Sequence, residues 1–387
     1  MSEDLVIGLL AIAYLLAAIG FCFLADLTQW LVQAPRFVYM KIFHFREPLM
    51  ILSLTAFLLA LIANYWVGVL GWQGVTLNLV VFIPFFIGAF QLVNVMFPRQ
   101  QSGAVFEPTT KVDPYIRRDD EVMVVELNGD ARAFPNKWMR QPHIVGDTIG
   151  GEEIVMTYCS LSHLGLAYSP YINGKKAELK TFTQLQNNLV MFDSNTDEPI
   201  QQIYGKTEHG GQGMQEYPVQ VMTYGAFKML YPDGKVFYNP ARKVKDTLVR
   251  MMLRTVINWQ HELDVPVFPT IDLDDPGLKQ LHLKEKVWCV RIADEKVAYT
   301  LDYFEKNNWI INTQVGGQDI VLVYYPGYRT VSGFERSING RTLTITELDN
   351  IDVNGNTPHG KLKRIPVASE VFWMIWYTFY PETRLNA

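Results

Sequence analysis

IVGDTIGGEEIVMTYCSLSH, residues Ile144–His163, is the stretch that decides how the large part of the chain folds. A Gly-Gly turn leads into an apolar run, Ile154–Tyr158, which predicts a β-strand. The strand delivers Cys159 into a short polar segment that ends at His163. Because a thiol and an imidazole follow the end of a strand, we take this stretch as the first candidate for a functional site.

The pattern of this stretch recurs further along the chain. Ile310–Tyr324 (IINTQVGGQDIVLVY) parallels Ile144–Tyr158, and Glu285–Tyr299 parallels Glu121–Phe134 at nearly the same offset. The matched features are turns and strand alternation, which are typical of a duplicated scaffold. We therefore expect two similar β-rich repeats that pack together.

The two copies differ where reactive side chains are found. Cys159 aligns with Tyr325, and His163 aligns with Arg329. Copies of one scaffold share the residues that they need for packing, so a reactive set present in only one copy is the better functional candidate. This comparison places the candidate site in the first copy.

The N-terminal part of the chain carries most of its apolar excess. Hydrophobic residues make up 49% of the 387 residues and charged residues only 19%. Three apolar runs, 5–25, 50–72 and 75–97, are each long enough to span about 30 Å of hydrocarbon as a helix. Glu3 and Asp4 give the first run an acidic leader, unlike a cleavable signal peptide. We expect three transmembrane helices and hence a lipid bilayer as a partner.

The segment between the first two spans predicts an interfacial helix or a tight loop. It combines the aromatic Tyr39 with the basic Arg36 and Arg46, and such residues anchor a chain at the headgroup level. Lys and Arg occur in this segment and after the third span, but not at the N-terminus or in the second connection. The positive-inside rule then places the large C-terminal domain in the cytoplasm.

These patterns predict an α+β chain in four parts. Residues 1–100 form the membrane domain, 110–240 the first β-rich repeat, 241–284 a helical connector and 285–387 the second β-rich repeat. Within the first repeat, an Asn-Gly pair after an alternating run indicates a tight hairpin, because this pair supplies the positive φ angles of a type I′ turn.

Two segments of the second half have their own patterns. Lys243–Glu262 in the connector has apolar residues at helical spacing and predicts an amphipathic helix. Phe372–Pro381, FWMIWYTFYP, is the most aromatic stretch of the chain and is too short to span a bilayer. It either packs on the β-rich domain or contacts lipid headgroups.

Several separated motifs in a fixed order resemble the bacterial domain of unknown function 3179 family. The motifs are ARAFPNKWM, HIVGDTIGGEEIVMTYCSLS, LQNNLVMFDSNTDEPIQQIYGKT, YPDGKVF and SEVFWMIWYTFYPETRL. The resemblance covers most of 113–385. It implies a β-rich domain and brings no established reaction with it.

The resemblance also bears on the thiol and on the compartment. Members of the family typically have Cys-Pro-Leu-Cys where this chain has Cys159, Ser160, Leu161 and Ser162. The missing second thiol argues against a two-thiol or metal-thiolate site. Many relatives look exported, which favours a periplasmic domain, whereas the charge rule favours a cytoplasmic one. We expect a multi-pass protein of the bacterial inner membrane and leave the side of its large domain open.

Cys159 is the candidate nucleophile, with His163 or His209 as the group that assists it. A cysteine becomes reactive when a nearby base or positive charge favours its thiolate. The alternative is a buried cysteine at the end of a strand, since cysteine is among the most buried residue types.

Five polar or aromatic residues of the first repeat are candidates for ligand binding. Amide and hydroxyl side chains can line a pocket and hydrogen-bond a ligand. The alternative is that they cap turns and strand ends. The candidates are Tyr158, Asn187, Asn188, Gln201 and Gln202.

The remaining signals mostly exclude classes of function. We expect no metal site, because H-x-x-x-H, H-E-x-x-H and paired C-x-x-C patterns are missing from the sequence. The formal charge of -5 gives no sign of a nucleic-acid-binding surface. No cofactor is indicated. Two hypotheses stay open: a thiol-dependent enzyme or redox protein centred on Cys159, and a non-catalytic membrane-tethered module that binds an unidentified small molecule or protein.

Overall fold

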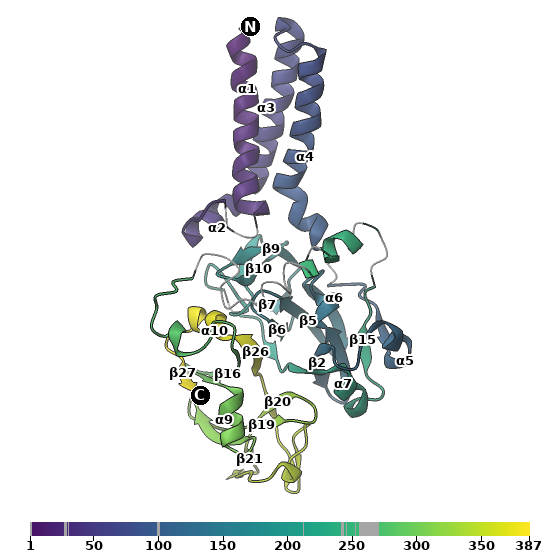
Figure 1. Cartoon of the computed structure of the whole chain (residues 1–387), viewed down its shortest axis with the longest axis vertical. Coiled ribbons are helices and arrows are strands. Elements are labelled where there is room, and N and C mark those ends of the chain that lie inside the picture. The colour runs from purple at the N-terminus through teal and green to yellow at the C-terminus, as the bar shows by residue number, and fades with distance from the viewer. Residues whose placement is uncertain are drawn as a thin grey trace.

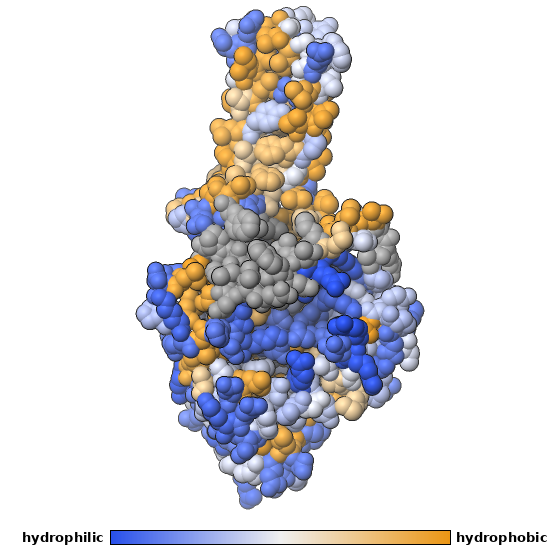
Figure 2. All heavy atoms as spheres, in the orientation of Figure 1, coloured by the Kyte–Doolittle hydropathy of each residue, from blue (hydrophilic) through white to orange (hydrophobic). Residues whose placement is uncertain are grey.

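The chain forms a helical stalk above a β-rich body (Figure 1). The computed structural model describes residues 2–26, 29, 31–98, 101–211, 213–240, 244, 246–251, 253–254 and 271–387. Apolar side chains cover the stalk, and polar ones dominate the visible face of the body (Figure 2). This division follows the composition, because apolar surface is stable in lipid and polar surface in water.

Three helices of the stalk are long and apolar enough to cross a membrane. They are α1 (Glu3–Gly20), which continues as a π-helical turn at Phe21–Ala25, α3 (Arg46–Val67) and α4 (Trp72–Met96). Gly68 ends α3 with a φ of 73°, a left-handed conformation that glycine adopts without strain. The prediction of three long apolar helices is confirmed.

Small residues bring these helices close together. Ala13 and Ala17 of α1 are buried with Ala56 of α3. Small side chains at such positions let helix backbones approach, which is how helices associate in lipid. Phe57 of α3 stacks on Phe82 of α4 at 3.9 Å between ring centroids.

A short helix, α2 (Arg36–His44), joins the stalk to the body. Its Phe43 is buried and packs with ring centroids 4.1 Å from Phe182 and 5.0 Å from Phe192 of the body. The guanidinium of Arg46, where α3 begins, stacks over the Phe43 ring at 4.1 Å. Part of the segment between the first two spans is therefore a helix whose aromatic side chain is inserted into the β-rich body, and its position at a membrane surface stays a prediction.

The first β-rich region contains one five-stranded and two four-stranded sheets among the described residues. Their orders are β1-β15-β3-β2-β14, β12-β11-β10-β9 and β13-β6-β5-β4. The strands are β1 (Phe106–Pro108), β2 (Glu121–Leu127), β3 (Asp130–Pro135), β4 (Ile144–Ile149), β5 (Glu152–Cys159), β6 (Leu164–Tyr168), β7 (Tyr171–Ile172), β8 (Lys175–Lys176), β9 (Leu179–Leu185), β10 (Asn188–Asp193), β11 (Glu198–Gln201), β12 (Lys206–Thr207), β13 (Glu216–Tyr217), β14 (Gln220–Thr223) and β15 (Lys235–Phe237). Short helices α5 (Thr109–Val112), α6 (Asn136–Met139) and α7 (Tyr224–Leu230) cover them.

The second β-rich region has two four-stranded sheets, β26-β16-β17-β27 and β18-β19-β20-β25, within the described part of the chain. Its strands are β16 (Lys286–Ile292), β17 (Glu295–Tyr299), β18 (Ile310–Val315), β19 (Gln318–Tyr325), β20 (Thr330–Glu335), β21 (Ser337–Ile338), β22 (Arg341–Thr342), β23 (Asn356–Thr357), β24 (Gly360–Lys361), β25 (Arg364–Ile365), β26 (Ala368–Phe372) and β27 (Arg384–Asn386). Its helices are α9 (Leu301–Lys306) and α10 (Trp373–Phe379).

The strand that leads to Cys159 is positioned by a glycine turn. Gly150 has a φ of 56°, and a Cβ there would lie 2.2 Å from the backbone oxygen of Leu127. Gly316 in the β18–β19 turn has the same φ, and its Cβ would lie 2.3 Å from the oxygen of Ile292. Only glycine fits such an approach. Each Gly-Gly turn is thus seated against the end of a neighbouring strand.

The aromatic C-terminal segment lies in the core between the regions. Trp373 and Trp376 of α10 are buried, and the same hydrophobic cluster contains Cys159, Leu164 and Val287. Of the two expectations for this segment, packing on the β-rich body is the one observed.

The predicted amphipathic helix of the connector is described only in part. Residues 246–251 are helical, as are 253 and 254. Most of the rest of Lys243–Glu262 lies outside the described residues, so helical backbone is observed for this short stretch and the amphipathic helix stays a prediction.

Candidate functional site

Cys159, at the end of β5, is sealed inside the body. It has no exposed surface, and its S–H group faces Oε1 of Gln184 at 3.2 Å and the backbone oxygen of Asn187 at 3.8 Å. Burial raises the pKa of the Cys159 thiol. The group is thus held as a neutral thiol, whereas a cysteine nucleophile reacts as the thiolate.

The amide side chains predicted to bind a ligand form a buried network. The Asn188 amide donates to Oε1 of Gln202 at 3.0 Å and to Oγ of Ser162 at 3.3 Å. Its Oδ1 accepts hydrogen bonds from Nε2 of Gln201 at 2.7 Å and from the backbone N–H of Ile203 at 3.2 Å. The network joins β10 and β11 to the loop that follows Cys159.

The Gln202 amide extends the network to two more strands. Its Nε2 donates to Oγ1 of Thr157 in β5 and to the backbone oxygen of Leu164 in β6, both at 3.1 Å. Tyr158 and Asn187 are also buried. Buried amides of this kind are stabilising only when they are paired. The ligand-binding assignment of these residues stays a prediction, and their observed bonds are internal.

The ring of His163 lies against two acceptors. Its Nε2 lies 3.0 Å from Oε2 of Glu121, and its Nδ1 lies 3.0 Å from the backbone oxygen of Glu370. A carboxylate and a carbonyl both accept, so this geometry fits a ring whose two nitrogens both donate, which is the imidazolium form. A ring in this state has no lone pair with which to take a proton from Cys159.

Lys286 completes a cluster of four charged residues, Glu121, His163, Lys286 and Glu370, which we name the Glu121 cluster. The Lys286 ammonium lies 2.8 Å from Oε1 of Glu121 and 2.5 Å from Oε2 of Glu370. Glu121 and His163 belong to the first β-rich region, and Lys286 and Glu370 to the second. The cluster therefore links the two regions.

Two members of the cluster have a strained backbone. His163 has a φ of 52° and Glu370 a φ of 58°. Bulky side chains rarely adopt this left-handed conformation, and it costs about 1–3 kcal/mol per residue. Phe372 N donates to the backbone oxygen of Ser162 at 3.2 Å, so β26 also holds the strained loop through its backbone.

The charges of the cluster fix its protonation states. Burial would raise the pKa of Glu121, but the hydrogen bond and charge of His163 and the ammonium of Lys286 hold it far below its usual range. Burial would lower the pKa of Lys286, but the carboxylates of Glu370 and Glu121 raise it instead. Both groups are therefore charged across the neutral range.

The donor atoms of Glu121, His163 and Glu370 lie within 4.8 Å of one another, a spacing that suits a metal ion. The Lys286 ammonium already bridges both carboxylates. The arrangement thus contains its own cation, and a metal would have to displace it.

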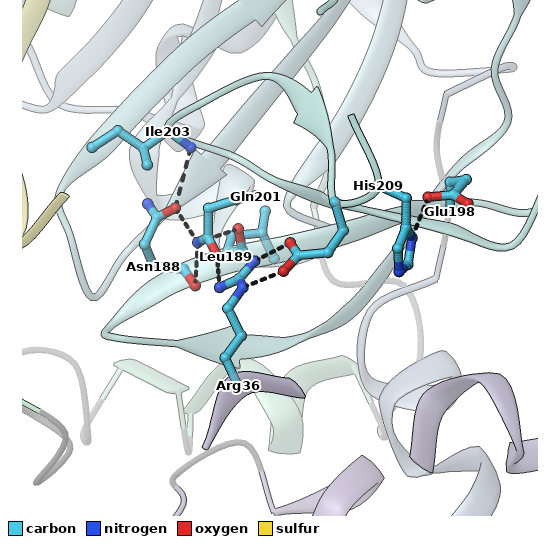
Figure 3. Close-up of polar contacts among 8 residues, drawn as sticks. Arg36, Asn188, Leu189, Glu198, Gln201, Ile203 and His209 are labelled. Carbon is cyan, nitrogen blue, oxygen red and sulfur yellow. Dashed lines mark hydrogen bonds and ion pairs between the residues drawn. The ribbon is translucent and has the colours of Figure 1, made fainter. Parts of the chain in front are cut away.

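His209 lies apart from Cys159, at the joint with α2. Its Nδ1 is 2.9 Å from Oε2 of Glu198, and the side chain is exposed. Figure 3 shows Arg36 reaching from α2 toward Gln201, with His209 to one side. Arg36 forms a two-pronged ion pair with Glu208 at 2.7 and 2.6 Å and bonds Oε1 of Gln201 at 2.7 Å.

Cys159, His163 and His209 have different polar partners among the described residues. Sequence analysis missed Glu121, Lys286 and Glu370, which come from three separate strands. The signal that could have identified one of them is the position of Glu370 inside the motif SEVFW. No sequence spacing indicates that Glu370 lies near Glu121 or Lys286.

A second joint holds the end of α4 against the body. His143 is buried and its ring stacks on Phe97, with 4.4 Å between centroids. Gln141 Nε2 donates to the backbone oxygen of Met96 at 2.8 Å. Nδ1 of His143 has no hydrogen-bond partner within the described residues. Burial lowers the pKa of His143 to about 4, so the ring is neutral.

Comparison with known proteins identifies one family. The family described as "Protein of unknown function (DUF3179)" matches residues 98–383. No curated protein and no solved structure matches the chain significantly.

Replacing Lys286 with methionine tests the role of its charge. Two carboxylates then face one histidine ring, and we expect a loss of about 2 kcal/mol in unfolding free energy. This is less than when a fully buried ion pair loses one partner, because the Lys286 side chain is 35% exposed and solvent screens its charge. We also expect zinc ions to raise the melting temperature of Lys286→Met but not of the unaltered chain. Lys279→Met, at an exposed ion pair, is the control and should change neither quantity. Equal stability of the two variants would refute the role given to Lys286.

Because His143 is buried and neutral at this joint, we expect the unfolding free energy of the chain to decrease in mild acid. The pKa is about 4 in the folded chain and about 6.5 when unfolded, so the unfolded state binds the proton first as the pH falls. The contribution of the neutral His143 ring to the unfolding free energy is fully present above pH 6.5 and decreases toward pH 4. About 2 kcal/mol of it is lost by pH 5. Denaturant unfolding at pH 7 and pH 5 measures it. His143→Asn, which tolerates the positive φ, should flatten the dependence; an unchanged slope would contradict the assignment.

Proposed function

The chain belongs to the DUF3179 family of proteins of unknown function, and on that premise we propose that it is a membrane-tethered module that binds a ligand and catalyses no reaction. The observation that carries the proposal is the environment of Cys159, a fully buried thiol whose pKa is raised by burial. The neighbouring histidine supports it, since both nitrogens of His163 are committed to acceptors.

The attachment of the body to the stalk favours tethering over free movement. Phe43 is inserted between Phe182 and Phe192, and Arg36 is paired with Glu208. At the other side, the His143 ring stacks on Phe97 at the end of α4. Because two joints attach the β-rich body to the stalk, the orientation of the body is fixed. The surfaces of the body that face the bilayer therefore keep a constant distance from the bilayer.

We infer that the two β-rich regions are copies of one duplicated unit, covering 110–240 and 285–387. Equivalent pairs support this, because Ile144 pairs with Thr157 in β4–β5 and Ile310 pairs with Val323 in β18–β19. The Glu121 cluster then acts as an ionic link between the copies. A duplicated scaffold with a fixed interface suits a binding or assembly module.

We place the chain in the inner membrane of a bacterium. The charge rule puts the body in the cytoplasm, and the family resemblance puts it in the periplasm. Protease protection of the body in spheroplasts decides between the two, because only a periplasmic body would be cleaved from outside.

A thiol-dependent enzyme or redox protein centred on Cys159, with His163 and His209, is the second candidate. The observation in its favour is the hydrogen bond from the thiol to Gln184, a polar group that could orient it. This mechanism requires an opening of the body that exposes Cys159 to a substrate.

Thiol labelling separates the two functions. In a chain carrying Cys22→Ser and Cys289→Ser, Cys159 is the remaining thiol. We expect maleimide to react with it at least about a hundred-fold more slowly than with a cysteine introduced by Ser337→Cys, because labelling must wait for local opening. Ser337 is exposed in β21 and serves as the reference. Labelling of Cys159 as fast as the reference would favour the enzyme.

A further inference from the structure

A cavity of about 330 Å³ lies where the stalk meets the body. One wall is Met50 in the second turn of α3 and residues 89–94 near the end of α4. The opposite wall is formed by β9 and β10 of the body. Because the walls include the ends of two spans, the cavity lies at the level of lipid headgroups.

The lining of the cavity is amphiphilic. Aromatic and aliphatic side chains, including Leu24, Phe90 and Phe182, form its apolar part. Its charged part is mixed, with the basic Arg46 and Lys180 and the acidic Glu47 and Asp197. A ligand that fills the cavity would therefore combine an apolar chain with a charged group.

Two polar groups of β9 that line the cavity have no protein partner among the described residues. The Thr181 hydroxyl is buried, with only 6% of the residue exposed, and has no hydrogen-bond partner among the described residues. Lys180 lines the same cavity and forms no ion pair within the described part of the chain. Arg46 differs, because Asp197 pairs with it at 2.5 Å. An unpaired buried hydroxyl costs about 1–3 kcal/mol, which a ligand acceptor would recover.

A β-bulge explains why three consecutive residues reach one cavity. Side chains along a regular strand alternate between its two faces. In β9 the register shifts, so that Thr183 pairs with Val190 but Thr181 pairs with Met191. The extra residue, Phe182, breaks the alternation, and Lys180, Thr181 and Phe182 all line the cavity. Bulges often redirect side chains toward a functional site.

We propose that this cavity binds one phospholipid molecule, with its phosphate ester held by Lys180 and Thr181. The ammonium of Lys180 and the hydroxyl of Thr181 donate to phosphate oxygens, and the acyl chains lie against Phe90 and Met50 of α4 and α3. The inference rests on the proposed binding function and names its ligand class. A bound lipid would stabilise the joint between stalk and body.

The position of the cavity favours a lipid over a soluble phosphate. A free phosphate would leave the apolar wall formed by Leu24, Phe90 and Phe182 without a partner. A lipid in the adjoining leaflet reaches that wall without leaving the bilayer, and its headgroup is already at the level of Lys180. Both ligands share the phosphate, so the test must separate them.

Native mass spectrometry of the full chain in dodecyl maltoside tests the proposal with three probes. Phosphatidylglycerol carries the phosphate and the chains, glycerol 3-phosphate carries only the phosphate, and diacylglycerol carries only the chains. We expect one phosphatidylglycerol to be retained per chain, with binding by the other two at least about ten-fold weaker. Equal binding of either partial probe would overturn the proposal.

Two variants locate the site, and one serves as a control. Lys180→Gln should weaken binding of phosphatidylglycerol about ten-fold, the effect of losing one hydrogen bond from a charged group. Thr181→Val should weaken binding while leaving the melting temperature of the lipid-free chain unchanged or higher, because its hydroxyl has no hydrogen-bond partner among the described residues. Lys175→Gln, at an exposed position in β8, should bind as the unaltered chain does.

Equal affinities in all three variants would overturn the lipid site. That result would leave the proposed function standing as long as Cys159 resists labelling. Fast labelling of Cys159 would instead overturn the non-catalytic function whatever the lipid measurements give.

Discussion

Lys286 lies between the carboxylates of Glu121 and Glu370, and His163 donates to the first of them and to the backbone of the second. Taking four charged groups largely out of water is costly, so the arrangement is stable only if each has its partner. The partners come from both β-rich regions. Docking of the two regions therefore depends on the cluster. The cluster in turn forms only when the two regions are docked. The strained backbone of His163 and Glu370 is tolerated because these contacts hold it.

The same interactions also hold the loop that follows Cys159 in place. His163 is turned toward Glu121, and Asn188 bonds Ser162 from the other side. Cys159 is left beneath the loop, where burial keeps it a neutral thiol. The polar side chains that first suggested a reactive site thus form contacts that join strands and regions. A part of the body that is open to a ligand is the cavity where the stalk meets the body, in which Lys180 and Thr181 have no protein partner among the described residues.

Local patterns made much of the fold predictable. The spans follow from long apolar runs, and the β2–β3 hairpin turns at Asn128 and Gly129 as their backbone preferences require. The comparison of the two predicted repeats drew attention to His163, which is a member of the cluster. Its partners could not be found in this way, because Glu121 and Lys286 are 165 residues apart and only tertiary packing brings them together. The bulge in β9 could not be predicted from the sequence either, because it arises from the pairing of β9 with β10.

The protonation of the His163 ring tests the central claim most directly. If the residue is an ionic link and not a base, both ring nitrogens carry hydrogen and donate, one to Glu121 and one to the backbone of Glu370. Nitrogen-15 NMR of the full chain, labelled at histidine and assigned with a His163→Gln variant, measures this. The account predicts chemical shifts of two protonated nitrogens. A neutral ring with one unprotonated nitrogen would contradict it, because such a ring is available to accept a proton.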